Sequence, residues 1–234
     1  MEPASYRFAT PLLQGTLVRR YKRFLADVRL QNGHVVVAHT PNTGSMRSCR
    51  TPGSRVYLSR AANRDRKLRY TLEIVEAGGT LVSVNTLVPN RLVERAVRAG
   101  AIPELAGYPE VRREVPVGES RIDLELGPSP RCYVEIKNVS LGEGVVARFP
   151  DAVTERGRRH LEELRGCVAA GHRAVIFFLV QRSDCDHLEP ADAIDPDYGR
   201  ALRRAVAAGV EALAYRAAVG LDAITLERRL PVRL

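Results

Sequence analysis

The chain has 234 residues, of which 45% are hydrophobic and 27% are charged. This length and composition are sufficient for one large domain or two smaller ones with buried cores. No apolar run approaches the ~18 residues that a membrane-spanning helix requires, and the first residues lack the basic and apolar regions of a signal peptide. We therefore expect a cytoplasmic protein that does not bind membranes.

The formal net charge is +9, and the whole excess lies in the first third of the chain. Residues 1–83 contain 14 Lys and Arg against 5 Asp and Glu, whereas residues 84–234 contain 22 of each kind. A segregated basic region favours a polyanionic partner, and nucleic acid is the first candidate. The alternative is a basic surface without a specific partner.

The cysteines indicate neither disulfides nor a metal centre. No pair among Cys49, Cys132, Cys167 and Cys185 has CxxC spacing. The nearest metal-like motif, Cys185-Asp186-His187, lacks a second pair of ligands. We expect four reduced thiols.

The first third of the chain predicts short strands separated by turns, at residues 12–20, 24–30, 34–40, 54–60, 70–77 and 80–85. Asn32-Gly33 and Gly78-Gly79 are two-residue hairpin signals. So many short strands in about 70 residues favour a small barrel, and an oligonucleotide-binding (OB) fold is the leading case. We assign residues 1–84 to this all-β, DNA-binding domain.

Basic and aromatic side chains are interleaved in the predicted barrel. The aromatic ones are Tyr21, Phe24, Tyr57 and Tyr70; about half of them are expected to fill the barrel. The others could stack bases while neighbouring cations follow the phosphates. The candidate cations are Arg19, Arg20, Lys22, Arg23, Arg60, Arg64, Arg66, Lys67 and Arg69.

Residues 39–53 are rich in turn formers and lack apolar periodicity, which predicts a long loop. As a functional loop it would cradle phosphates through backbone N–H groups around Thr43, Gly44 and Ser45, beside Asn42. Alternatively, it merely crosses one end of the barrel.

The periodicity becomes helical after residue 84, where the second domain, residues 85–234, is predicted to begin. Asn90 is a candidate N-cap and Gly100 a stop for a helix whose buried residues are Leu92, Val93, Ala96, Val97 and Ala99. Residues 101–108 predict a loop or short helix, and residues 113–118 a strand. Glu94 and Glu104 are candidate site carboxylates, although Glu94 has arginine neighbours that favour a solvated helix face.

Residues 120–139 predict a β-hairpin around the turn at Gly127, Pro128 and Pro130. On its first strand Arg121, Asp123 and Glu125 share one predicted face, and Ile122, Leu124 and Leu126 share the other. On its second strand Tyr133, Glu135 and Lys137 alternate with Val134 and Ile136. Pairing would bring Asp123 close to Glu135 and Lys137, and two carboxylates beside an ammonium can hold a divalent cation and activate water.

The remaining chain predicts an α/β domain with a mixed sheet. After a loop at residues 141–150, residues 151–171 predict a helix with a buried stripe of Val153, Leu161, Leu164 and Val168. Arg156 and His160 lie on another face of this helix. A continuous apolar strand at residues 172–181, a helix at 197–209 and strands at 210–219 and 224–230 follow.

Asp123 followed by Glu135-Ile136-Lys137 resembles the PD-(D/E)xK nuclease superfamily. Its core places Asp on one strand, Glu-x-Lys on the next, and then a helix. The resemblance implies catalytic roles for Asp123, Glu135 and Lys137, with Asp123 and Glu135 as metal ligands. Which of Glu94, Glu104 and Glu114 fills the superfamily's early helix position stays open; Glu104 is included among the catalytic candidates.

Almost the whole chain resembles the bacterial sugar fermentation stimulation protein A family, through the segments RRYKRFLADV, HTPNTGSM, NTLVPNRL, SRIDLEL, CYVEIKNVSL, FPDAVTERGRRHLEEL and RAVIFFLVQR. The resemblance implies an OB-fold barrel followed by a PD-(D/E)xK nuclease-like domain. It also implies nonspecific DNA binding and a role in regulating maltose metabolism.

Two functions follow from these patterns. The first is a DNA-binding regulator whose barrel grips the backbone of DNA, single-stranded DNA included, through Arg19, Arg20, Lys22, Arg23, Asn42, Thr43, Arg66, Lys67 and Arg156. The second is a nuclease in which Asp123 and Glu135 bind Mg²⁺ or Mn²⁺ and Lys137 stabilises charge on the phosphate, with Thr154 and His160 assisting. A surface hydrogen bond is the alternative for His160. No sugar ligand is indicated, and the oligomeric state stays open.

Overall fold

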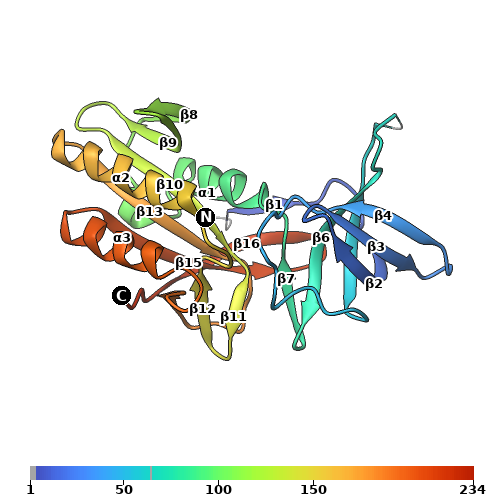
Figure 1. Cartoon of the computed structure of the whole chain (residues 1–234). Helices are drawn as coiled ribbons and strands as arrows, with labels where there is room; N and C mark the ends of the chain where they lie inside the picture. Colours follow the sequence, from blue (N-terminus) through green and yellow to red (C-terminus); the bar gives the residue numbers. More distant parts are fainter. Residues whose placement is uncertain (1–3, 64) are drawn as a thin grey trace.

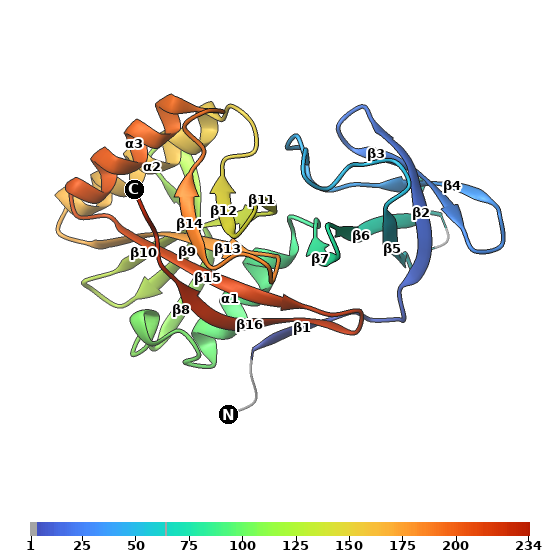
Figure 2. The same cartoon turned by 90° about the horizontal axis from the view of Figure 1, so that it is seen from below.

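The computed structural model describes residues 4–63 and 65–234, which form a barrel and an α/β domain lying side by side (Figures 1 and 2). Arg64, one of the cations predicted on the barrel, lies outside the described residues. No helix in the described part of the chain is both long and apolar enough to cross a membrane.

The first domain is a closed barrel. Its strands run in the order β4-β3-β2-β5-β6-β7, and parallel pairing between β4 and β6 closes the sheet. Gly33, Gly78 and Gly79 have positive φ, which glycine adopts without a steric penalty in tight turns. The predicted OB-type barrel is confirmed. Its strands are β2 (Leu13–Tyr21), β3 (Leu25–Leu30), β4 (Val35–His39), β5 (Arg55–Arg60), β6 (Tyr70–Ala77) and β7 (Thr80–Ser83).

The second domain contains a seven-stranded mixed sheet in the order β1-β16-β15-β13-β10-β9-β8. β10, β13 and β15 are parallel neighbours, whereas the outer strands pair antiparallel. The predicted α/β class with a mixed sheet is confirmed. The strands are β1 (Ser5–Arg7), β8 (Glu110–Val117), β9 (Ser120–Gly127), β10 (Cys132–Val139), β13 (Arg173–Val180), β15 (Glu211–Val219) and β16 (Ala223–Leu230).

The first strand of the chain belongs to this second sheet. β1 pairs antiparallel with β16 through Ser5, Tyr6 and Arg7. The chain therefore enters the α/β sheet, crosses to form the barrel, and then returns. The assignment of all residues before 84 to the barrel is corrected at this point, because three residues alone carry too weak a strand signal to reveal a distant partner.

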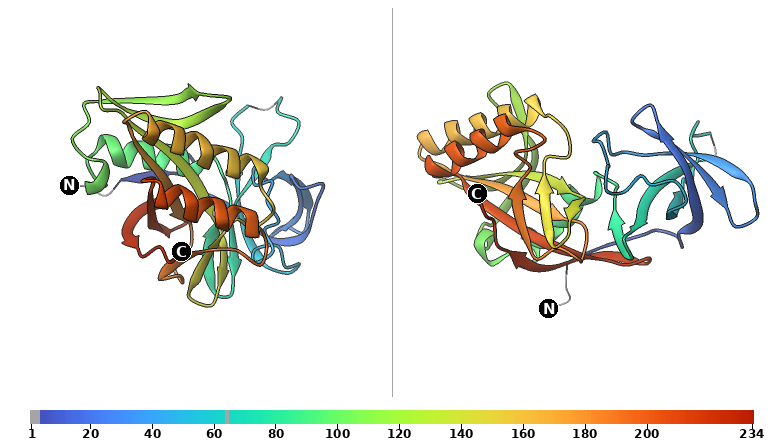
Figure 3. Two further views of the ribbon diagram at one scale, coloured as in Figure 1. Left: turned by 60° about the vertical axis from the view of Figure 1, so that its left-hand side comes forward. Right: turned by 60° about the horizontal axis from the view of Figure 1, so that its bottom comes forward.

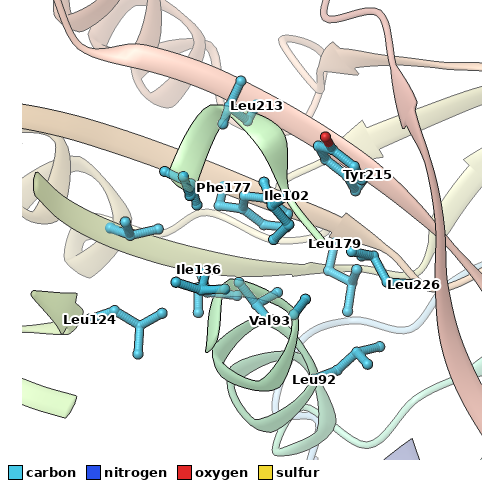
Figure 4. Packing of buried hydrophobic residues seen from close by; sticks show 14 of the residues in the cluster. Leu92, Val93, Ile102, Leu124, Ile136, Phe177, Leu179, Leu213, Tyr215 and Leu226 are labelled. Atoms are coloured by element: carbon cyan, nitrogen blue, oxygen red, sulfur yellow. The ribbon is translucent and has the colours of Figure 1, made fainter. Parts of the chain in front are cut away.

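Helices cover both faces of the mixed sheet (Figure 3). α1 (Val88–Arg98) packs its Leu92 and Val93 against Leu124, Ile136 and other apolar residues of one face (Figure 4). A single turn of 3₁₀ helix (Pro103–Leu105) follows α1. α2 (Glu155–Ala169) and α3 (Pro196–Ala207) pack side by side on the other face. The four cysteines are buried and free, as predicted.

Two features of the second domain differ from the sequence prediction. Residues 141–150, predicted as a loop, contain the strands β11 (Leu141–Glu143) and β12 (Val146–Phe149), which form a small sheet with β14 (His187–Pro190). Val153, predicted in the buried stripe of a helix, is 68% exposed because α2 begins only after the cap at Thr154.

The loop at residues 39–53 fastens the barrel to the α/β domain. Ser45 Oγ donates to the Asp151 carbonyl at 2.6 Å, and Met46 N donates to Asp151 Oδ2 at 3.0 Å. Gly44 allows this close approach, since a Cβ at this residue would overlap the Asp151 carboxylate. The loop is thus a strap between domains, which neither reading of the sequence anticipated.

Candidate functional site

Asp123 lies where two neighbouring strands separate. The pairing of β9 with β10 extends to Leu124 and Val134 and stops there. In the opening, Asp123 Oδ2 accepts a hydrogen bond from Ile136 N at 2.7 Å, and Asp123 Oδ1 accepts one from Asn90 Nδ2 at 2.6 Å. The Asp123 carboxylate is therefore fixed between the backbone of β10 and the first turn of α1.

Glu135 lies on β10 next to this opening and is held by two basic groups. Lys137 Nζ donates to Glu135 Oε1 at 2.6 Å, and His160 Nδ1 contacts the same oxygen. The exposed fractions of the side chains are 4% for Glu135, 4% for His160 and 11% for Lys137. Glu135 Oε2 is buried and has no hydrogen-bond partner.

The two carboxylates have opposite pKa shifts. Burial, followed by the negative charge of Glu135, raises the pKa of Asp123 to about 7. Burial also disfavours ionisation of Glu135, but the Lys137 charge and the His160 hydrogen bond outweigh it, so the pKa of Glu135 lies below its ordinary value. Near neutral pH, one carboxylate of the pair is ionised and the other is close to its titration point.

His160 orients Glu135 from α2. Arg156 Nε donates to His160 Nε2 at 3.2 Å, and His160 Nδ1 faces Glu135 Oε1. Because Nε2 accepts, Nδ1 carries the proton of the neutral ring. Both ring nitrogens are thus engaged, which fits a residue that positions the carboxylate. The alternative prediction of a surface hydrogen bond is wrong, since this side chain is buried.

The simple alternation predicted for β9 fails at Asp123. Ile122 packs into the core beneath α2 and α3, whereas Leu124 packs into the core beneath α1. On β8, Glu114 stands between the residues that pair with Ile122 and Leu124, and it has a left-handed φ of 52°. At this irregularity in the pairing of β8 with β9, Ile122 and Leu124 lie on opposite faces of the sheet. Their assignment to one face is therefore corrected.

Neither Glu94 nor Glu104, two of the predicted early carboxylates, reaches the site. Glu104 Oε2 accepts from Tyr215 Oη at 2.7 Å, and its Oε1 pairs with Arg229; its predicted place in the catalytic set is wrong. Glu94 pairs with Arg98 and Arg113 instead.

Asn90 occupies the position that a carboxylate was expected to fill. It was predicted as an N-cap, but α1 already begins at Val88, so Asn90 lies in the first turn and reaches Asp123. This role depends on the packing of the predicted helix against the predicted hairpin. Sequence spacing alone does not reveal that contact.

The residues offer a partial divalent-metal site. Within residues 4–63 and 65–234, no three His, Cys, Asp or Glu side chains converge as a metal-binding group. The Asp123 carboxylate nevertheless accepts from Ile136 N, next to Glu135 on β10, and the buried Glu135 Oε2 lacks a partner. Mg²⁺ is commonly held by one or two carboxylates and several waters, so this set fits such an ion.

Several predicted nucleic-acid ligands of the barrel hold the strap instead. Arg20 donates to the carbonyls of Asn42 at 2.8 Å and Gly44 at 2.9 Å. Asn42 is buried, and its Oδ1 accepts from Gly44 N. Arg20 and Asn42 are therefore structural, which corrects their predicted role. Thr43 stays exposed and receives a hydrogen bond on its carbonyl from Arg23 Nε at 3.1 Å.

Most of the other predicted cations that the structure describes are exposed, whereas Arg69 is half-buried. Lys22 and Arg23 form the turn between β2 and β3, beside the exposed Phe24. Arg19 pairs with Asp27 at 2.7 Å and lies over the Tyr21 ring. Exposed positions are also found for Arg66, Lys67 and, on α2, Arg156.

A cavity of ≈ 240 Å³ that is open to solvent lies between the two domains, at the end of β10 that follows Lys137. The barrel contributes Arg23, Asn42 and Thr43, and the second domain contributes Asn138 and Thr154, among others. Thr154 caps α2, since its Oγ1 accepts from Gly157 N at 3.0 Å. The basic turn of the barrel thus opens onto the same cavity as the chain segment that carries Lys137.

Comparisons with known proteins agree with this architecture. The family model described as the sugar fermentation stimulation protein RE domain matches residues 87–223, and that of the family's N-terminal OB domain matches residues 18–84. The chain is 58% identical to the sugar fermentation stimulation protein homolog of Pelobacter propionicus, over 96% of this chain and 98% of that protein. The homolog from Geobacter metallireducens is also 58% identical, over 97% of this chain and 100% of that protein.

A solved structure matches the whole fold. It is Pyrococcus furiosus SfsA in complex with Ca²⁺, which covers 100% of both chains with a TM-score of 0.91 and 30% identity. The resemblance that the sequence motifs indicated is confirmed over both domains. The chain belongs to the sugar fermentation stimulation protein family.

Proposed function

We propose that this protein binds DNA and cleaves its phosphodiester bonds with Mg²⁺ or Mn²⁺ held by Asp123 and Glu135. The observation that carries the proposal is that the Asp123 carboxylate accepts from the backbone N–H of Ile136, the residue between Glu135 and Lys137, whose side chains contact each other. An ionised carboxylate beside a second one with a pKa of about 7 is the state expected of a cation site before the cation binds.

A bound divalent ion would supply Lewis acidity toward a phosphoryl oxygen and an incoming water. The protein's own groups have separate tasks. Asn90 and the Ile136 N–H fix the Asp123 carboxylate, and His160 fixes Glu135. Lys137 is half-buried with its ammonium on Glu135, so it can stabilise negative charge that develops on a phosphate held next to that carboxylate.

Electrostatics favours a polynucleotide, DNA or RNA, as the substrate. The net charge of residues 1–83 equals that of the whole chain, +9. Its exposed cations Lys22 and Arg23 lie at a turn that opens, through Arg23, onto the cavity between the domains. A polynucleotide strand whose phosphates contact this turn would continue toward Asn138 and Lys137. The Ca²⁺ in the related Pyrococcus furiosus structure supports a divalent ion as the cofactor.

DNA binding without cleavage is the second candidate. It is favoured because, within the described residues, no three His, Cys, Asp or Glu side chains form a metal-binding group, and the ring nitrogens of His160 are taken up by Arg156 and Glu135. In this case the Lys137 ammonium would neutralise Glu135 permanently, and the protein would act as a nonspecific DNA-binding regulator of sugar metabolism, maltose use included.

The test incubates the purified protein with circular and linear DNA, single- and double-stranded, in Mg²⁺, Mn²⁺ or EDTA. Cleavage that requires the metal and disappears in Glu135→Gln supports the nuclease. Glu104→Gln is the matched control, because this carboxylate lies on Tyr215 and Arg229 and should leave cleavage unchanged. Retained DNA binding with no cleavage under any condition would support the regulator instead.

A further inference from the structure

A second hollow lies on the other side of His160, between the tip of the β8–β9 hairpin and α2. It measures ≈ 470 Å³ and is lined by Pro116, Gly118, Glu119, Ser120, Arg121, Arg156, Arg159 and His160. Glu163 fastens the hairpin to the helix, since its Oε1 accepts from Glu119 N at 3.1 Å. A Cβ at Gly118 would overlap the Glu163 carboxylate, so the hairpin tip approaches α2 closely.

Three arginines of this hollow lack a carboxylate partner. Most arginines of the α/β domain have an acidic group within 4.0 Å, as in the pairs Arg173–Glu211 and Arg216–Glu227. Among the residues that the structure describes, Arg121, Arg156 and Arg159 have none. All three are exposed. The domain has equal numbers of acidic and basic residues, and yet three of its arginines lie together without a carboxylate partner.

The hollow is joined to the proposed catalytic group by direct contacts. Arg156 Nε donates to His160 Nε2 at 3.2 Å, and His160 contacts Glu135. Arg121 lies on β9 two residues before Asp123. An anion bound by these guanidinium groups would therefore lie next to the carboxylates and not at a remote surface.

We propose that Arg121, Arg156 and Arg159 bind a phosphate group of the polynucleotide adjacent to the phosphodiester at Asp123 and Glu135. Guanidinium groups present several N–H donors in a fork that matches phosphate oxygens. Glu119 is the one acidic side chain lining the hollow, and it is exposed to solvent, so it can turn away. The position of this phosphate relative to cleavage rests on the proposed function, whereas anion binding itself does not.

The test measures the binding of a fluorescent single-stranded oligonucleotide in EDTA over a range of salt concentrations. EDTA prevents cleavage, so the anion site can fail or succeed independently of the nuclease. The double variant Arg121→Ala/Arg159→Ala removes two exposed side chains that have no carboxylate partner. The matched control, Arg228→Ala/Arg233→Ala, removes two other such arginines at β16 and beyond it, and thus the same net charge.

We expect the first variant to bind about tenfold more weakly and the slope of log K against log salt to fall by about 1.4, as for two lost contacts to single-stranded phosphates. The control should bind within twofold of the wild type. Equal weakening in both variants, or an unchanged salt slope in the first, would overturn the proposal. Thermal melting of both variants excludes unfolding as the cause of weaker binding.

The phosphate can be internal or terminal, and the form of DNA distinguishes the two. An internal phosphate requires that circular single-stranded DNA show the same loss of affinity as the linear oligonucleotide. A terminal phosphate requires that the loss appear only with 5′- or 3′-phosphorylated ends. Either pattern supports the anion site; a loss with none of these DNAs contradicts it.

Discussion

The barrel and the α/β domain treat their cations in opposite ways. In the described part of the barrel, Arg19 and Arg55 have carboxylate partners, whereas Lys22, Arg29 and most other cations have none. In the α/β domain most arginines are paired, some of them through two hydrogen bonds, as Arg203 is with Asp192.

The difference shows which cations are available to a polyanion. A paired arginine must give up its carboxylate before it can bind a phosphate, whereas an unpaired one gives up only water and counterions. The barrel thus presents a broad cationic surface, which would attract a polyanion. In the α/β domain Arg121, Arg156 and Arg159 are unpaired near Asp123 and Glu135, so part of the available charge of this domain lies beside the proposed chemistry.

The largest effect is expected at the carboxylates. Glu135→Gln keeps the shape of the side chain but removes the charge that would hold a divalent ion. Metal-dependent cleavage should fall on the order of 100-fold or more, while DNA affinity in EDTA stays near that of the wild type. The measurement is a gel assay of cleavage alongside fluorescence anisotropy. A parallel loss of binding and cleavage would mean that Glu135 supports the fold of the binding surface instead.

The comparison of paired with unpaired cations can be tested directly by salt dependence. Lys22→Ala/Arg23→Ala in the barrel should lower the slope of log K against log salt by about 1.4 to 1.8. Arg200→Ala/Arg203→Ala removes two cations that are paired with Asp197 and Asp192, and should leave the slope nearly unchanged. Equal slopes for the two variants would break the distinction between the domains.

The pKa of Asp123 gives a pH dependence of stability. Its folded-state value of about 7 lies above the ordinary 3.8, so between these values the folded protein binds a proton that the unfolded chain lacks. Stability from this group is therefore present at low pH and declines as the pH rises toward 7. Asp123→Asn cannot lose a proton, and Asn90 can rotate its amide to present its oxygen to the new NH₂ group.

In EDTA at pH 8, Asp123→Asn should melt at a higher temperature than the wild type. Its unfolding free energy should be larger by about 2 kcal/mol. The difference should shrink toward pH 5. Adding Mg²⁺ should raise the melting temperature of the wild type and leave the variant unchanged. A variant that is less stable than the wild type at pH 8 in EDTA would contradict the raised pKa.

The smallest effect concerns α2, which carries both Arg156 and His160. A Cβ on Gly166 meets no atom within 4 Å, so Gly166→Ala fills open space within the helix. The substitution should stabilise the protein by about 0.5 to 1 kcal/mol. Chemical denaturation measures this gain. If this variant binds DNA as the wild type does, the larger effects of the charge-removing variants come from the lost charge.

The sequence was sufficient to predict the elements whose periodicity is local. Six barrel strands, the hairpin that carries Asp123 and Glu135, and the buried strand β13 all appear close to their predicted bounds. Alternation and Gly-containing turns report on each strand by itself, and tertiary packing agrees with them here. The pairing of Glu135 with Lys137 follows in the same way, from two residues on one face of one strand.

What the sequence missed depends on partners that are distant along the chain. Asn90 reaches Asp123 only because α1 packs beneath β9 and β10, and Glu104 is drawn away by Tyr215 and Arg229. Arg20 was predicted to bind phosphate, but its guanidinium group donates to backbone carbonyls of the strap. The change of face at Asp123 requires the left-handed Glu114 on the neighbouring strand, which no local pattern signals.

The pairing of β1 with β16 makes the barrel an insertion within the α/β sheet and not a detachable head. A fragment that began at residue 85 would leave β16 as a bare strand edge with unpaired N–H and C=O groups, which invites pairing between chains. Separating the two proposed activities by truncation would thus create a fragment that is prone to aggregation. Single substitutions in the intact chain avoid that problem.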